Sequence, residues 1–140
     1  MVAYSFQRRF APDVQSLIKT HTIRADRKRH ARVGEPIQLY CGMRTKGCFK
    51  IIPDPVCTFA EPIQIVLDRD SILMIRLGPL QAYEVQPDHF DQFARLDGFN
   101  DASHMAEFWD EEKTNPIADI YAREFNGWII GWGRHPSEVL

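Results

Sequence analysis

The stretch Lys19–Arg24, with the sequence KTHTIR, decides how the chain folds around it, because a helical pattern ends there and a strand pattern begins. Before it, Pro12 precedes a segment in which Val14, Leu17 and Ile18 recur at i, i+3 and i+4, the spacing of one apolar helix face. Proline is well suited to the first turn of a helix. Within the stretch, β-branched threonines occupy alternating positions, which favours a strand. We therefore predict a corner between a short helix over 12–18 and a strand that begins at about residue 20.

The corner raises a question about which side chains can act together. Side chains alternate along a strand, so Thr22 and Arg24 are predicted to share one face and Lys19 to point the opposite way. Lys19 and Thr22 can meet only if Lys19 lies before the strand, where alternation does not yet apply. The simpler interpretation is that the threonines are ordinary strand formers and Lys19 is a solvated cation at a helix end, where it favours the helix dipole.

The rest of the chain predicts an α+β fold. Short strand patterns occur at 37–41, 48–52, 56–66, 72–85 and 125–132, separated by turns rich in glycine and proline. Helical spacing returns in two segments, one around Phe90–Ala94 and one around Met105–Trp109. Closely spaced short strands favour a small barrel, which leaves few open edges. At 140 residues, we expect one domain over 1–140: a small β-barrel, a short N-terminal helix and two helices after the central strands.

The composition excludes several classes of protein. With 44% hydrophobic and 26% charged residues, it is typical of a globular domain, and no apolar stretch is long enough to span a membrane. Arginines at 8 and 9 stand where a secretory signal would be apolar, so we expect a cytoplasmic protein. The three cysteines form no Cys-x-x-Cys pair and are expected to be reduced. The five histidines are scattered, so we expect no metal ion. We also expect no other cofactor.

The charge is divided unevenly along the chain. Residues 1–50 hold 11 basic and 3 acidic residues, a net charge of +8, whereas residues 51–140 hold 6 basic and 16 acidic residues, a net charge of −10. A dense basic arm follows the corner, with Arg27, Lys28 and Arg29 in succession and Arg32 close behind. Such a cluster is typical of a face that attracts phosphates, although a solvated loop paired with acidic residues is the commoner arrangement.

Five segments carry motifs of one known family. They are Ser5-Phe6 with Arg9-Phe10, Lys19–Arg24, Val33–Tyr40, Asp97–Phe99 and Met105–Trp109. The second matches a Gly-x-Lys-Thr-x-Thr-Ile-Arg pattern and the third a strand that ends in tyrosine. Together they resemble the ASCH domains of the PUA-like superfamily over most of the chain. The resemblance implies a PUA-like barrel and a choice of activities, since the family includes RNA-binding modules, an amidohydrolase acting on N4-acetylcytidine, and single-strand ribonucleases.

The resemblance to the amidohydrolase branch implies a role for each matching residue. Lys19 would be the activating base and Thr22 the nucleophile. Asp97 falls on the catalytic glutamate of the family as acid or base, and Arg24 would be the electrostatic anchor. The chain departs from the pattern at Leu17, where the family has glycine, and at Asp97, whose side chain is one methylene shorter. The chemistry is consistent, because a threonine hydroxyl needs a base, and lysine can be one if burial or a nearby cation lowers its pKa.

Three other functions remain open. The first is the binding of single-stranded RNA or a nucleotide without catalysis, and the second is the cleavage of single-stranded RNA. The residues expected to hold nucleoside or RNA in any of these functions are Arg9, Arg24, Arg27, Lys28, Arg29, Arg32, Tyr40, Arg44 and Lys46, and Trp132 is an alternative to Tyr40 for stacking. In the last strand, Trp132 alternates with Trp128 and Ile130, and this face is expected to pack the core. The third function is that of an interaction domain that uses the acidic run 110–112.

Overall fold

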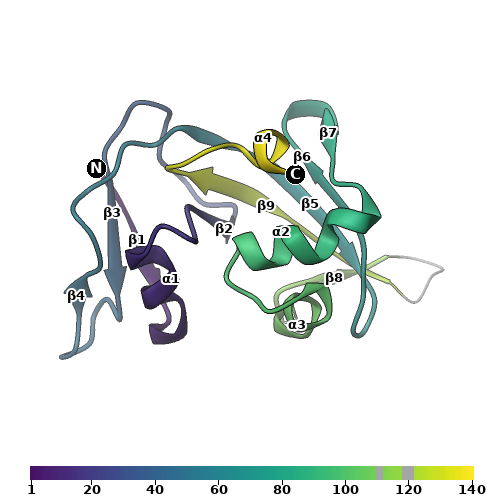
Figure 1. Cartoon of the computed structure of the whole chain (residues 1–140), viewed down its shortest axis with the longest axis horizontal. Coiled ribbons are helices and arrows are strands. Elements are labelled where there is room, and N and C mark those ends of the chain that lie inside the picture. Colours follow the sequence, from purple (N-terminus) through teal and green to yellow (C-terminus); the bar gives the residue numbers. More distant parts are fainter. Residues whose placement is uncertain (110–111, 118–121) are drawn as a thin grey trace.

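The computed structural model describes residues 1–109, 112–117 and 122–140 (Figure 1). Its strands are β1 (Val2–Phe6), β2 (His21–Ala25), β3 (Ile37–Cys41), β4 (Phe49–Lys50), β5 (Phe59–Leu67), β6 (Ile72–Leu77), β7 (Tyr83–Glu84), β8 (Asn115–Pro116) and β9 (Arg123–Gly131). Its α-helices are α1 (Ala11–Gln15), α2 (Phe90–Leu96), α3 (Ala102–Phe108) and α4 (Pro136–Val139). Short 3-10 turns lie at η1 (Arg8–Phe10), η2 (Pro79–Gln81) and η3 (Pro87–His89).

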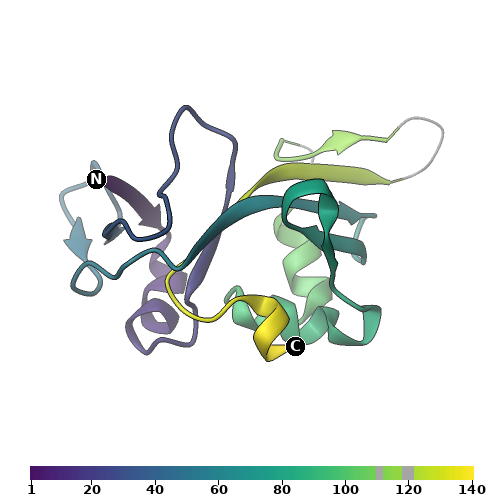
Figure 2. The same cartoon turned by 90° about the horizontal axis from the view of Figure 1, so that it is seen from above.

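The strands form two sheets. The smaller has the order β1-β3-β4, with β1 parallel to β3, and the larger has the order β2-β9-β5-β6-β7, with every neighbour antiparallel and β8 added beside β9. Figures 1 and 2 show the small sheet and α1 at one end of the molecule and the large sheet at the other, with α2 and α3 on one face of the large sheet. Strand β2 is an edge strand of the large sheet, and Figure 1 shows it between α1 and α2.

The α+β prediction is confirmed, including two helices after the central strands. The barrel is not confirmed, because the two sheets are not closed into one in the described part of the chain. The strand expected at 48–52 is reduced to Phe49–Lys50, and the one expected at 72–85 is divided into β6 and β7. The division falls at Gly78, whose φ of +92° belongs to the left-handed region that favours glycine.

The expected helix before the corner is shorter than its apolar pattern. Helix α1 ends at Gln15, and although Val14 is fully buried, Leu17 and Ile18 are 63% and 58% exposed. The apolar face predicted for this helix is therefore buried only at Val14. The chain turns at Leu17, whose φ is +64°, and the backbone N–H groups of Ile18 and Lys19 both donate to the carbonyl oxygen of Asp13. The backbone turn at Leu17 therefore ends the helix before the last two apolar residues of the pattern.

One hydrophobic cluster runs through the whole described chain, from Val2 to Trp132. Strand β9 is central to it, because Ile129 and Ile130 are both fully buried although they point to opposite faces. The predicted core face of this strand is confirmed for Ile130 and Trp132, whereas Trp128 is only half-buried. Among the described residues, no helix has the length and apolar character that crossing a bilayer requires.

Candidate functional site

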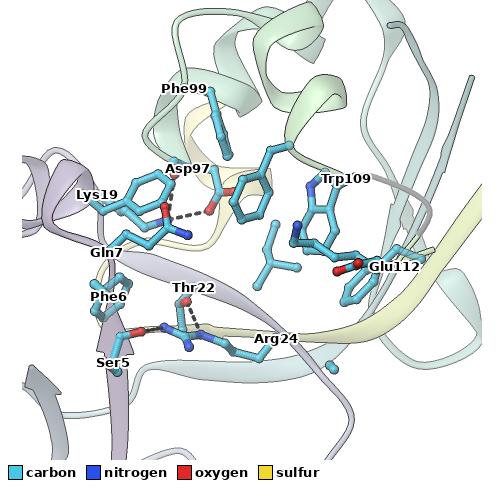
Figure 3. A pocket seen from close by; sticks show the side chains of 16 residues that line it. Ser5, Phe6, Gln7, Lys19, Thr22, Arg24, Asp97, Phe99, Trp109 and Glu112 are labelled. Atoms are coloured by element: carbon cyan, nitrogen blue, oxygen red, sulfur yellow. Dashed lines mark hydrogen bonds and ion pairs between the residues drawn. The ribbon is translucent and has the colours of Figure 1, made fainter. Parts of the chain in front are cut away.

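A cavity of about 470 Å³ lies beside β2, between the N-terminal elements and helices α2 and α3 (Figure 3). Its apolar wall is largely aromatic and consists of Phe6, Phe10, Phe99, Phe108, Trp109 and Phe125. Its polar lining includes Lys19, Thr22, Arg24 and Asp97. A concave, mostly apolar site with a few convergent polar groups is the usual form of a small-molecule binding site.

Lys19 and Asp97 form a buried ion pair at one side of this cavity. Lys19 Nζ lies 2.6 Å from Asp97 Oδ1 and also donates to the Asp97 backbone oxygen at 2.7 Å, and the two residues are 3% and 4% exposed. Asp97 is held at the C-terminal end of α2, where Gly98 turns the chain with a φ of +96°. A side chain at residue 98 would also meet the Phe10 ring. The turn thus fixes the carboxylate over Lys19.

His21 completes a buried cluster of three titratable groups. Its Nε2 lies 3.1 Å from Asp97 Oδ1, without the alignment of a hydrogen bond, and its ring stacks on Phe93 with centroids 5.8 Å apart. Burial lowers the pKa of His21, so the imidazole is neutral at pH 7. Burial alone would raise the pKa of Asp97, but Lys19 and His21 outweigh it and lower that pKa, so the carboxylate is ionised. Burial lowers the pKa of Lys19, and the Asp97 carboxylate opposes this only in part.

The buried cluster predicts that acid destabilises the fold. His21 has a folded-state pKa below its ordinary value of 6.5, so below that pH the unfolded chain binds a proton that the native state excludes. Asp97, with a lowered pKa, adds stability that is lost as the pH falls further, through its folded-state value. We expect the free energy of unfolding to fall between pH 7.5 and 5.5, with a His21 contribution of at most about 1.4 kcal/mol per pH unit.

Urea unfolding of wild type, His21→Gln and His89→Gln at the two pH values measures this effect. His89 precedes α2, is only half-buried and lies outside the buried cluster, so its variant should keep the wild-type pH dependence, whereas His21→Gln should have a shallower one. Equal slopes in all three proteins would show that His21 is not buried in its neutral form.

Thr22 and Arg24 lie across the cavity from the ion pair (Figure 3). Arg24 Nε donates to Thr22 Oγ1 at 2.8 Å, and its Nη2 donates to the Ser5 backbone oxygen at 2.7 Å. Burial lowers the pKa of Arg24 from 12.5 to about 10, so it remains a cation at pH 7. Because Thr22 accepts from Arg24, the proton of its own hydroxyl is left for another acceptor. Thr22 is 3% exposed and is therefore held in one position.

Lys19 fulfils the condition under which it can share a face with Thr22. It lies before β2, which begins at His21, and so its side chain does not follow the alternation of the strand. Lys19 and Thr22 therefore line the same cavity, and the alternative of a solvated Lys19 is wrong, because the turn at Leu17 carries it inward. In the described part of the chain, no hydrogen bond joins Lys19 to Thr22 directly.

The other predicted binding residues lie outside this cavity. The Arg9 guanidinium lies over Phe10 and Phe99 and contacts His104. Tyr40 is half-buried on β3 under Lys50, while Arg44 and Lys46 are exposed in the turn before β4. The basic arm borders a second cavity, which is lined in part by Arg27, Lys28, Arg29 and Arg32.

Several residues of the site were missed by the sequence analysis. His21 had no visible partner, since Asp97 lies 76 positions away in sequence, and the aromatic wall has the spacing of ordinary core residues. Glu112 also lines the cavity, whereas residues 110–111 of the acidic run lie outside the described part. Among the described residues, no three His, Cys, Asp or Glu side chains gather as metal ligands would.

The chain was compared with protein-family models, with curated proteins and with solved structures. No family model, no curated protein and no solved structure matches it. The geometry of the site is therefore the main basis for a function.

Proposed function

We propose that this protein is a hydrolase that cleaves the amide of an acylated nucleobase, of the N4-acetylcytidine type. The observation that carries the proposal is the convergence of Lys19, Thr22 and Asp97 on one aromatic cavity beside Arg24. Lys19 and Asp97 are 78 positions apart in sequence, yet both are almost fully buried. Buried titratable groups with altered pKa values around a cavity are typical of catalytic sites.

The cavity suits a nucleoside in size and in chemistry. A volume of about 470 Å³ lies within the usual range for small-molecule sites. Its aromatic wall offers rings against which a planar base can stack, and Trp109 and Phe125 already pack with centroids 4.3 Å apart. Membership of the ASCH family, with its PUA-like barrel, is part of this proposal. It is supported by the motif segments 19–24 and 97–99, both of which border the cavity.

In the proposed reaction, the Thr22 hydroxyl oxygen attacks the amide carbonyl carbon and its proton passes to neutral Lys19. Lys19 rests as the ammonium of its ion pair with Asp97, and burial, which lowers the pKa of Lys19, makes the neutral form that accepts this proton more accessible. The C–N bond then breaks, and Lys19 returns the proton to the leaving amine nitrogen. A water molecule hydrolyses the resulting Thr22 ester, releasing the carboxylic acid and restoring the hydroxyl.

Asp97 and Arg24 act by charge in this mechanism. When Lys19 takes the proton, the ammonium that forms lies 2.6 Å from the Asp97 carboxylate, which stabilises it. Since Asp97 is ionised, it positions Lys19 and does not donate a proton. Arg24 donates to Thr22 Oγ1 and therefore stabilises the negative charge that develops there during attack.

The test is the turnover of N4-acetylcytidine, with cytidine and acetate quantified by chromatography. Wild type should release both, and Lys19→Met should lower the rate about 10²–10⁴-fold, the usual contribution of a general base. Lys50→Met, which removes an exposed lysine of β4 outside both this cavity and the basic arm, should keep the wild-type rate. If no cytidine forms while single-stranded RNA is bound or cut, the proposal fails and an RNA-directed function of the basic arm replaces it.

A further inference from the structure

We infer that the second cavity, between the basic arm and the large sheet, binds a nucleotide. It measures about 510 Å³ and is lined by residues 26–33 together with Ala60 of β5 and Trp128 of β9. Figure 2 shows the connection from β2 to β3, which contains the arm, as a long loop that leads from the large sheet to the small one. This site is separate from the catalytic cavity and does not depend on the proposed hydrolase activity.

The arm is anchored at its centre, which fixes the backbone that carries its cations. His30 is 8% exposed, with Nδ1 2.9 Å from the Tyr4 hydroxyl and Nε2 3.0 Å from the Ala25 backbone oxygen. The backbone N–H of Ala31 donates to the same Tyr4 hydroxyl at 3.1 Å. Arg27 is ordered as well, because its Nε donates to the Arg29 backbone oxygen and its guanidinium lies 4.5 Å from the centre of the Tyr4 ring. Such anchoring is not expected of a solvated loop.

The cavity has an excess of positive charge. Arg27, Lys28, Arg29 and Arg32 line it, and the acidic groups near them are Asp26 in the lining and Glu35 beside it.

Glu35 holds part of the arm and leaves the rest available. Its carboxylate accepts from Arg29 Nη2 at 2.5 Å and from the Arg32 backbone N–H at 2.7 Å. Lys28 makes no hydrogen bond or ion pair with any described residue. The four cations and two carboxylates leave two positive charges, about the charge that a phosphate monoester neutralises.

Trp128 gives the cavity an aromatic surface. It is half-buried on the face of β9 that it shares with Arg24, its neighbour in register on β2. Its ring contacts His30 at a tilt of 33°, with centroids 5.9 Å apart. Stacking on such a ring is the usual way in which proteins hold an unpaired base, and arginine is suited to the phosphate. An aromatic ring and guanidinium groups around one cavity therefore fit a ligand with both a base and a phosphate.

The ligand is either a free nucleotide or one nucleotide of a single-stranded RNA. The two cavities adjoin along the chain, since Ala25 lines the first and Asp26 the second. A strand of RNA that enters the arm could therefore continue toward the first cavity. The experiment separates the two sources by comparing uridine 5′-monophosphate with a hexanucleotide of uridine.

Binding is measured by titration calorimetry on the full chain, at about 50 and 200 mM salt. Trp128→Leu should raise the Kd of both probes about 5- to 150-fold, from about 1–3 kcal/mol per stacked base, and Trp128→Phe should restore most of the affinity. Arg27→Ala should weaken both probes and reduce the salt slope by about one. Arg69→Ala, in the exposed turn between β5 and β6, is the matched control and should bind as wild type does.

The outcomes show whether the second cavity binds a nucleotide, and whether that nucleotide is free or part of an RNA strand. A hexanucleotide that binds at least about tenfold more tightly than the monophosphate identifies an RNA strand, and equal affinities identify a free nucleotide; both support the site. The binding assay uses neither N4-acetylcytidine nor a variant of the first cavity, so a failure of the hydrolase proposal does not affect this result. The inference is overturned if neither probe binds, or if Trp128→Leu binds as tightly as wild type.

Discussion

Asp97→Ala is expected to lower the free energy of unfolding by about 3–5 kcal/mol, because it leaves the Lys19 ammonium buried without a counter-charge. The two residues are 4% and 3% exposed, so water cannot replace the lost carboxylate without opening the structure. Only the backbone oxygen of residue 97 would still accept from Lys19. Urea denaturation, monitored by tryptophan fluorescence, measures the loss.

The exposed pair between Lys50 and Asp54 provides a matched control. Lys50 Nζ lies 2.7 Å from Asp54 Oδ1, close to the 2.6 Å between Lys19 and Asp97, but both side chains of the exposed pair are at least one-quarter exposed. Asp54→Ala should therefore cost less than about 1 kcal/mol.

A double variant separates charge from packing. Lys19→Met combined with Asp97→Ala removes both charges, and we expect it to recover at least half of the lost stability. If the double variant is less stable than Asp97→Ala alone, the unpaired charge is not the cause of the loss.

The second large effect concerns Thr22. Thr22→Val removes the hydroxyl and keeps the shape, and in the proposed hydrolase it should reduce kcat on N4-acetylcytidine by at least about 10⁴-fold, as the loss of a nucleophile does. Thr22→Ser keeps a hydroxyl that can accept from Arg24, so it should retain measurable turnover. A rapid-quench assay should also detect an acyl-enzyme in wild type and in Thr22→Ser, but not in Thr22→Val.

Thr20→Val is the matched control for that experiment. Thr20 precedes β2 in the same segment and is half-buried, but it does not line the cavity. Its variant should keep both the acyl-enzyme and the wild-type kcat. If Thr22→Val retains more than about one-tenth of wild-type kcat while its unfolding midpoint is unchanged, Thr22 is not the nucleophile.

The helix-to-strand corner at 19–24 shows which structural features a local sequence pattern can predict. The β-branched alternation correctly predicted the strand, and the apolar repeat correctly predicted a helix before it. The repeat failed at Leu17 and Ile18, because a backbone turn that bonds to Asp13 ended the helix first. Hydrophobic spacing shows which residues could share a face, but it does not show where hydrogen bonds close the helix.

The site was only partly visible in the sequence. Lys19, Thr22 and Arg24 are close together in the chain, and the resemblance added Asp97 from the second half. The contact of His21 with Asp97 and the aromatic wall were not visible, since they result from the packing of α2 and α3 against the sheet. The same holds for Trp128, which was expected in the core but lines the second cavity.

The sequence by itself determined the α+β class, the helix-to-strand corner and the clustering of cations in the first 50 residues, because each depends on residues that are near one another in the chain. Only the tertiary structure decided that Lys19 is buried against Asp97, that Thr22 lies across the same cavity, and that the basic arm stands over an aromatic ring. These arrangements depend on contacts between distant segments, and their energies come from burial and charge pairing that no local pattern contains.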